Sequence, residues 1–140
     1  MIVEHYTLEY TTRGDDHIVD MTRQVQDAVA GSGISIGQAA LLVHGSTAAL
    51  TTLEYEPGLV DHDIAAAMER VAPRNVRYVH EETWHDDNGH SHVRAFTVGP
   101  SLALPIVAGK IPLGTWQQVV LVDFDTRARS RTVHLSVLGR

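Results

Sequence analysis

The C-terminal part of the chain alternates strand-length runs of β-forming residues with short turn sequences, and this pattern restricts the fold most strongly. The runs are "LALPIV" (102–107), "TWQQVVLVDF" (115–124) and "RTVHLSVL" (131–138). A turn at Gly109 and the polar stretch "DTRARS" (125–130) separate them. Valine, isoleucine, threonine and aromatic residues favour strands, and short polar or glycine-containing stretches favour turns. The pattern therefore predicts a β-meander.

Four further segments have strand character. "IVEHYTLEY" (2–10) carries β-formers in partial alternation, and "AALLV" (39–43) is a short apolar run bounded by polar residues. "AALTTLEY" (48–55) follows it after the turn "HGST". In "HSHVRAFTV" (90–98), alternate residues carry the histidines, the arginine and the phenylalanine, which also predicts a strand.

Two segments between these strands have helical periodicity. Apolar residues recur at mostly helical spacing after Asp15 and Asp16, either of which could cap the helix, and Gly31 would end it. A second helix opens at "EPGL" and ends at Pro73. Together the segments predict an α+β fold with a mixed or antiparallel sheet of about seven strands and two main helices. The length fits one domain, residues 1–140.

The composition narrows the classes of partner. The formal net charge of −6 argues against binding to a nucleic-acid backbone, which needs a basic surface. The chain has no cysteine, so any metal would need nitrogen and oxygen ligands. Its apolar run "LALPIVA" is far shorter than the ~20 residues of a membrane helix. The acidic N-terminus is unlike a signal peptide, so we expect a cytoplasmic protein.

Histidines concentrate in "YVHEETWHDDNGHSHVRAF" (78–96), which holds four of the nine in the chain. His90 and His92 are two residues apart, so a strand would project both from one face with Cα atoms about 7 Å apart. Neutral imidazoles so placed can share a metal ion at Zn–N distances of ~2.0–2.1 Å. Proton or phosphate handling is an alternative use. His85, beside the turn "DDNG", is interpreted as a solvated loop residue.

A third metal ligand would come from another part of the fold. A hairpin across "HDDNG" would bring His80 opposite His90 and His92. His44, at the end of the "AALLV" strand, is a weaker candidate for the third ligand. We therefore predict a divalent metal held by His80, His90 and His92. Zinc or manganese suits imidazole ligands, whereas magnesium prefers carboxylates. The remaining histidines do not cluster and are interpreted as surface or edge residues: His5, His17, His62 and His134.

Two further groups could bind a phosphate. The turn "HGST" offers the hydroxyls of Ser46 and Thr47 and a close backbone approach at Gly45, although a plain structural turn has the same sequence. Arg94 shares the strand parity of the histidine pair, and a guanidinium facing the same site would bind phosphate or carboxylate. A surface arginine is the alternative reading. The predicted catalytic group is then His80, His90, His92 and Arg94.

Longer segments of the chain resemble the YjbQ-like family. They are "GSTAALTTLEYEPG", "ETWHDDNGHSHVRA", "GPSLALPIVAGKIPLGTWQQVVLVDFD" and "RTVHLSVLG", in this order. The likeness covers essentially residues 1–140, and it implies a compact α+β domain that assembles as a homotrimer. Many family members have a histidine where this chain has Gly45 and an asparagine where it has Tyr55. The recurrent polar residues of the family match His80, His92, Ser101, Thr115, Trp116 and Gln117.

The resemblance also implies an activity, that of a secondary thiamine-phosphate synthase. Such an enzyme joins a pyrimidine-methyl diphosphate to a thiazole phosphate and releases pyrophosphate. The residues alone suggest metal-dependent hydrolysis of a phosphate ester as readily, and a non-catalytic trimeric binding protein for a small anionic metabolite is a third possibility. In each case we expect the phosphorylated ligand to contact Ser46, Thr47, Ser101, Thr115 and Gln117.

Overall fold

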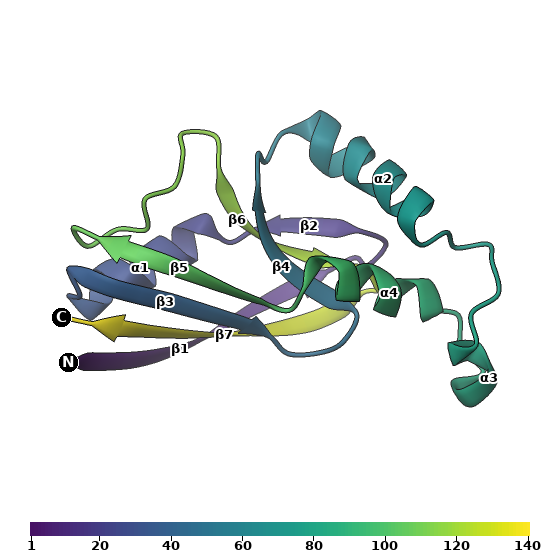
Figure 1. Cartoon of the computed structure of the whole chain (residues 1–140), viewed down its shortest axis with the longest axis horizontal. Helices are drawn as coiled ribbons and strands as arrows, with labels where there is room; N and C mark the ends of the chain where they lie inside the picture. Colours follow the sequence, from purple (N-terminus) through teal and green to yellow (C-terminus); the bar gives the residue numbers. More distant parts are fainter.

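The computed structural model describes all residues, 1–140, and has seven strands in two antiparallel sheets (Figure 1). Sheet A has the order β1 (Ile2–Thr12), β7 (Arg129–Gly139), β3 (Ile36–Val43) and β5 (Ser101–Val107). Sheet B has the order β2 (His17–Asp20), β6 (Gln118–Asp123) and β4 (Ala48–Leu53). The helices are α1 (Thr22–Ser32), α2 (Ile64–Val71) with a preceding π-helical turn (Leu59–Asp63), α3 (His80–Trp84) and α4 (Gly89–Val98). None of them has the length and apolar character needed to cross a membrane.

Strand β6 is apolar at consecutive positions because both of its faces are buried. Val119 and Leu121 point into the core between the two sheets. Val120 and Val122, on the opposite face, join a second cluster that includes residues of α2 and α4. The layers are therefore sheet A, sheet B, and the pair of helices α2 and α4, which places α4 on the outer face of sheet B.

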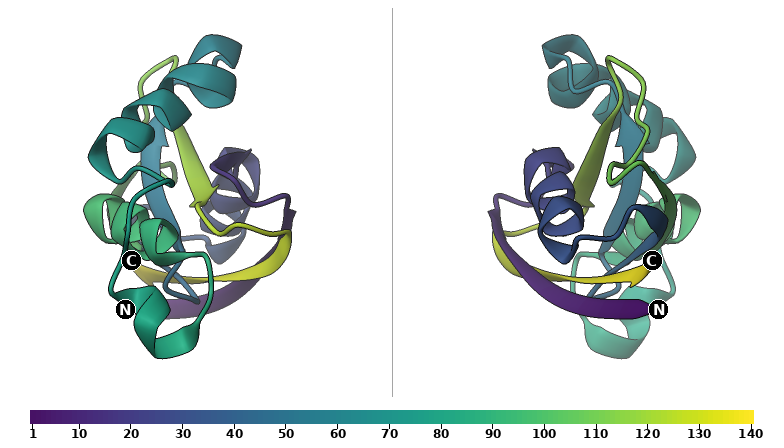
Figure 2. Two further views of the ribbon diagram at one scale, coloured as in Figure 1. Left: turned by 90° about the vertical axis from the view of Figure 1, so that its right-hand side faces the viewer. Right: turned by 90° about the vertical axis from the view of Figure 1, so that its left-hand side faces the viewer.

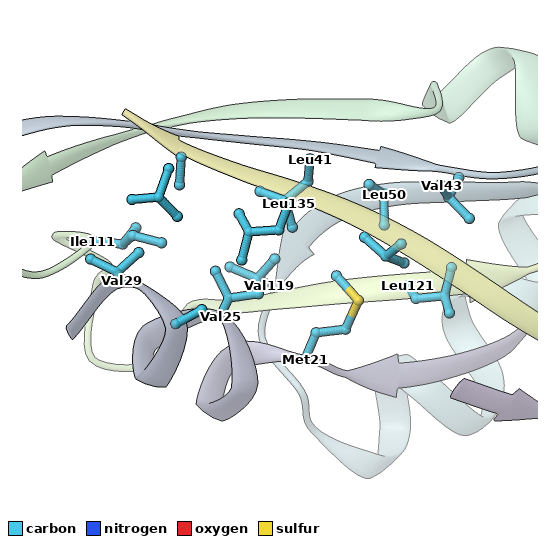
Figure 3. Close-up of a cluster of buried hydrophobic side chains, with 14 of the residues drawn as sticks. Met21, Val25, Val29, Leu41, Val43, Leu50, Ile111, Val119, Leu121 and Leu135 are labelled. Atoms are coloured by element: carbon cyan, nitrogen blue, oxygen red, sulfur yellow. The ribbon is translucent and has the colours of Figure 1, made fainter. Parts of the chain in front are cut away.

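Helix α1 closes one side of the space between the sheets. Its Val25 and Val29 are four residues apart on one helix face and are fully buried, in a cluster with Leu121 and Leu135 (Figure 3). Burying a side chain of this size stabilises the fold by about 1.5–3 kcal/mol. Helices α1 and α4 lie on opposite sides of sheet B (Figure 2).

Sheet A has one packed face and one exposed face. Along β7, Val133, Leu135 and Val137 are buried in the core, whereas the alternating residues His134 and Ser136 are only partly buried. Outward-facing residues of the neighbouring strands are exposed as well, among them His5 on β1 and Leu42 on β3.

The prediction of a strand over residues 90–98 is wrong, because these residues form most of α4. Burial follows helical spacing, with Ser91 and Arg94 fully buried and Ala95 packed on sheet B. Two residues turn an α-helix by about 200°. His90 and His92 therefore lie on different faces, and the expected pair on one strand face does not form.

The first helix also begins later than predicted. Residues 17–20 form β2, and the helix starts at Thr22, whose N–H and hydroxyl donate to the Asp20 carboxylate at 2.9 and 2.6 Å. Asp15 and Asp16, expected as caps, instead lie in the β1–β2 turn. The helix ends at the left-handed Gly33 (φ 72°) rather than at Gly31. The number of strands is thus confirmed, but β2 takes the place of the predicted strand 90–98.

Candidate metal centre

The chain reverses between α3 and α4, and this corner places His80 beside His92. Their ring centroids are 4.5 Å apart. The Gly89 N–H donates to Glu81 Oε1 at 2.6 Å, and a Cβ at position 89 would lie only 2.6 Å from Cβ of Tyr78. A glycine at this position therefore permits the tight corner. The sequence prediction that His80 approaches His92 is confirmed, although a helical corner, not a β-hairpin, brings them together.

Two carboxylates lie against His80. Its Nδ1 atom is 3.2 Å from Asp86 Oδ1 and 3.9 Å from Glu81 Oε1. The ligating atoms of these three residues all lie within 4.8 Å of one another. Despite the short distance to Asp86, the buried Nδ1 has no hydrogen bond, because the angular geometry is poor. A buried polar atom left unpaired costs about 1–3 kcal/mol, so a cation between imidazole and carboxylates fits the arrangement. The donor set of nitrogen and oxygen suits Zn²⁺ or Mn²⁺.

His92 lies beside both His80 and Ser46, and it lines the same hollow as Ser46. Burial, together with the neighbouring charge of His80, lowers the pKa of His92 below its usual value of 6.5. The neutral form therefore dominates at neutral pH, and in this form imidazole acts as a metal ligand or a base.

A hollow of about 410 Å³ opens next to His92. The hydroxyl-bearing Ser46 lies at one wall, and Gly45, with φ of 117°, adopts a backbone conformation that side chains rarely allow. The ring of Phe96 is 85% exposed and forms a flat apolar wall. The hollow thus combines a polar rim with an apolar surface. Its remaining lining residues are Ala48, Ala95 and Pro100.

Arg94 does not lie in this cluster, contrary to the prediction that it faces the same site. Its Nη1 donates to both carboxylate oxygens of Asp16 at 2.9 and 3.0 Å, and its Nη2 donates to Glu69 at 2.7 Å. Its Nε donates to the Ala72 carbonyl, and the side chain is 1% exposed. These bonds leave the guanidinium no free face for a phosphate. Arg94 instead fastens α4 to the β1–β2 turn and to α2.

His90 is also separated from the other two histidines. It is buried on a different face of α4, where its ring centroid lies 6.5 Å from that of Tyr78. Burial, and then the charge of Arg94, lower its pKa. The structure therefore brings together His80 and His92 but not His90. Glu81 and Asp86 were not among the predicted ligands, although both lie in the stretch "HEETWHDDNGH", which mixes histidines with acids.

The predicted phosphate ligands are spread over the chain. Ser46 lines the hollow beside His92, but Thr47 is buried, with its hydroxyl bonded to Asp125 at 2.9 Å and to Arg131 at 2.7 Å. Gln117 lies at the other end of sheet B. Ala48 pairs with Asp123 at one end of β4, and Leu53, five positions further along, pairs with Gln118, a span of about 17 Å. The exposed Thr115 and Trp116 belong to the same loop, and Ser101 begins β5 on the outer face of sheet A. Trp116, 73% exposed, is therefore not a core residue.

Comparison with known proteins identifies the family. The sequence profile described as "UPF0047 protein YjbQ-like" matches residues 6–140. A UPF0047 protein of Methanothermobacter thermautotrophicus is 32% identical over 142 residues, covering 100% of this chain and 96% of that protein. The UPF0047 protein YugU of Bacillus subtilis is 31% identical, covering 95% of this chain and 98% of that protein.

Solved structures of similar proteins have the same fold over nearly the whole chain. The crystal structure of a protein from Sulfolobus solfataricus, described as of unknown function, has a TM-score of 0.87 and 31% identity, with 99% of each chain covered. A hypothetical protein from Aeropyrum pernix has a TM-score of 0.89 and 30% identity, covering 98% of this chain and 99% of that one. The chain belongs to the YjbQ-like UPF0047 family.

Proposed function

We propose that this protein is a metal-dependent enzyme that hydrolyses a phosphate ester of a small metabolite. The observation that carries the proposal is the cluster of His80, Glu81 and Asp86, with His92 beside it, at the edge of a hollow large enough for a small organic ligand. Histidines and carboxylates in one cluster, next to a partly apolar pocket, are the ordinary composition of an active site.

His80, Asp86 and Glu81 would hold the divalent ion, with His92 as a further ligand or as a base. When bound, such an ion polarises a phosphoryl oxygen and lowers the pKa of a coordinated water. The lowered pKa of His92 favours its neutral form, which accepts a proton from water more readily than it donates one.

The hollow indicates the substrate class. The Ser46 hydroxyl and the backbone at Gly45 would bind phosphate oxygens, while Phe96 and Ala95 would contact the organic part. An aromatic or heterocyclic ring could stack on the exposed Phe96 ring. The proposed substrate is therefore a phosphorylated small molecule with a flat apolar portion.

The same hollow favours a second candidate, the thiamine-phosphate-synthase reaction that the family resemblance implies. A pyrimidine-methyl diphosphate also combines a flat ring with a phosphate chain, so it would suit Phe96 and Ser46 equally. The homotrimer implied by the resemblance belongs to this proposal, since a neighbouring chain would be needed to bring Thr115 or Gln117 toward the hollow, whereas Ser101 directly follows its lining residue Pro100. A non-catalytic binding protein would hold the ligand without turnover.

Turnover assays on metal-free and metal-loaded protein separate these functions. We expect phosphate release from an aryl phosphate with Zn²⁺ or Mn²⁺, and a loss of about 10²–10⁴-fold in His92→Ala, the range for a lost acid–base group. His62→Ala, at an exposed histidine outside the cluster, is the matched control. Pyrophosphate release from the two thiamine precursors would instead identify the synthase. Background rates in both assays, or equal rates in His92→Ala and the wild type, would refute the enzymatic proposal.

A further inference from the structure

A second group of histidines lies on the exposed face of sheet A. His5 is on β1, His134 is on β7 and His44 directly follows β3, and these three strands are neighbours in the sheet (Figure 1). His5 pairs with Ser136, His134 pairs with Thr7 and Leu42, and the His44 N–H donates to the Thr132 carbonyl. The three imidazoles therefore follow a diagonal across three adjacent strands.

The first two rings already have the spacing of metal ligands. His5 Nε2 and His134 Nδ1 are 3.4 Å apart. Two nitrogen ligands at about 2.05 Å from a tetrahedral zinc ion would be about 3.3 Å apart. The ring centroids are 5.5 Å apart, with an angle of 25° between the ring planes. The sheet register thus holds two imidazole nitrogens at a separation that one ion can bridge.

The neighbouring groups support this arrangement. Nδ1 of His5 lies 3.4 Å from Ser136 Oγ, so a hydrogen bond there would leave the Nε2 lone pair directed at His134. A second polar partner of this kind orients most metal-bound histidines. His44 meets His134 edge to face, with ring centroids 6.5 Å apart, and its side chain is exposed. Another side-chain rotamer of His44 would supply a third nitrogen.

We propose that this outer face of sheet A binds a divalent transition-metal ion such as Zn²⁺. His5 Nε2 and His134 Nδ1 are the primary ligands, and His44 is the third. The remaining positions are open to water, because no carboxylate is hydrogen-bonded to any of the three rings. This site shares no residue with the cluster on α3 and α4, and its existence does not depend on the proposed function.

Zinc titration followed by calorimetry tests the proposal, with Co²⁺ absorption as a second readout of tetrahedral nitrogen ligation. The His80→Ala/His92→Ala double variant removes the other cluster, and we expect it to retain one ion per chain. In that background, His5→Ala or His134→Ala should weaken Zn²⁺ binding by at least about tenfold, since even indirect partners of a ligand are worth 10–100-fold. His62→Ala should bind Zn²⁺ like its parent.

Two results would overturn the sheet site. One is a double variant that binds no Zn²⁺ while the wild type binds one ion, which would leave the α3–α4 cluster as the only site. The other is unchanged affinity in His5→Ala and His134→Ala, which would mean that the two rings are joined by a hydrogen bond alone. Because all substituted histidines of sheet A lie on its exposed face, circular dichroism should report a native fold in each variant.

Discussion

Replacing Arg94 by methionine tests the account of how α4 is held. Methionine keeps much of the side-chain volume but removes every hydrogen bond to Asp16, Glu69 and the Ala72 carbonyl. The Asp16 side chain is 3% exposed, so water cannot replace the lost partner. Removing one member of a buried ion pair costs about 3–5 kcal/mol, because an uncompensated charge remains inside the protein.

The expected loss lies near the lower end of that range. Arg74 stays within 3.2 Å of Asp16 and would neutralise part of the charge, although its own side chain is 37% exposed. We therefore expect Arg94→Met to lower the free energy of unfolding by about 3 kcal/mol. At about 2.1 cal/mol/K per residue, the unfolding entropy of this 140-residue chain is about 0.3 kcal/mol/K. Dividing the lost free energy by this entropy gives a fall of about 10 °C in the midpoint temperature of thermal unfolding.

Urea and thermal unfolding followed by circular dichroism measure this change. The control is Arg23→Met, at an ion pair with Asp27 that is 3.8 Å long and 90% and 75% exposed, where we expect less than about 1 kcal/mol. A loss in Arg94→Met no larger than in the control would refute the buried position of Arg94. It would also revive the sequence-based prediction that this guanidinium faces an anionic ligand.

Two further predictions concern stability. The lowered pKa values of His90 and His92 mean that the folded chain binds fewer protons than the unfolded chain, whose histidines titrate near 6.5, so stability should fall as the pH decreases through that value. His90→Gln should flatten this dependence in urea unfolding across about pH 5–7, and an unchanged slope would contradict the assignment. Gly45→Ala should cost about 1–3 kcal/mol, because φ is 117° and the new Cβ would lie 2.7 Å from Arg131 Nη1. Gly31→Ala, at the penultimate residue of α1 where a new Cβ would meet no atom within 4 Å, should instead raise the free energy of unfolding by up to about 0.5–1 kcal/mol. A Gly31→Ala variant that is less stable than Gly45→Ala in chemical denaturation would refute both expectations.

Strands could be predicted from the sequence where the β-forming preference of their own residues is sufficient to identify them. β6 and β7 are long runs of β-forming residues bounded by polar turns, and their packing agrees with their local preference. Helix α4 could not be predicted in this way, because its buried face is polar. Ser91 and Arg94 recur at helical spacing, but an arginine becomes a buried residue only through Asp16 and Glu69, which lie 78 and 25 residues away.

The candidate sites were predictable to different degrees. The concentration of histidines between residues 78 and 96 pointed to His80 and His92, whose ring centroids lie 4.5 Å apart in the structure. Their arrangement depends on the Gly89 corner, which no periodicity reveals. His5 and His134 are 129 residues apart and meet only through the register of β1 and β7. Reading them as isolated surface residues was therefore the natural interpretation of the sequence, and it missed their contact.

Crystals of the protein grown with Zn²⁺, with diffraction data collected on both sides of the zinc absorption edge, test the central claim most directly. We predict an anomalous peak between His80 and Asp86, within about 2.0–2.2 Å of an imidazole nitrogen and a carboxylate oxygen, with His92 facing it. The same data from His80→Ala crystals should lack this peak. Wild-type crystals with zinc bound elsewhere and no peak at His80 would contradict the metal centre.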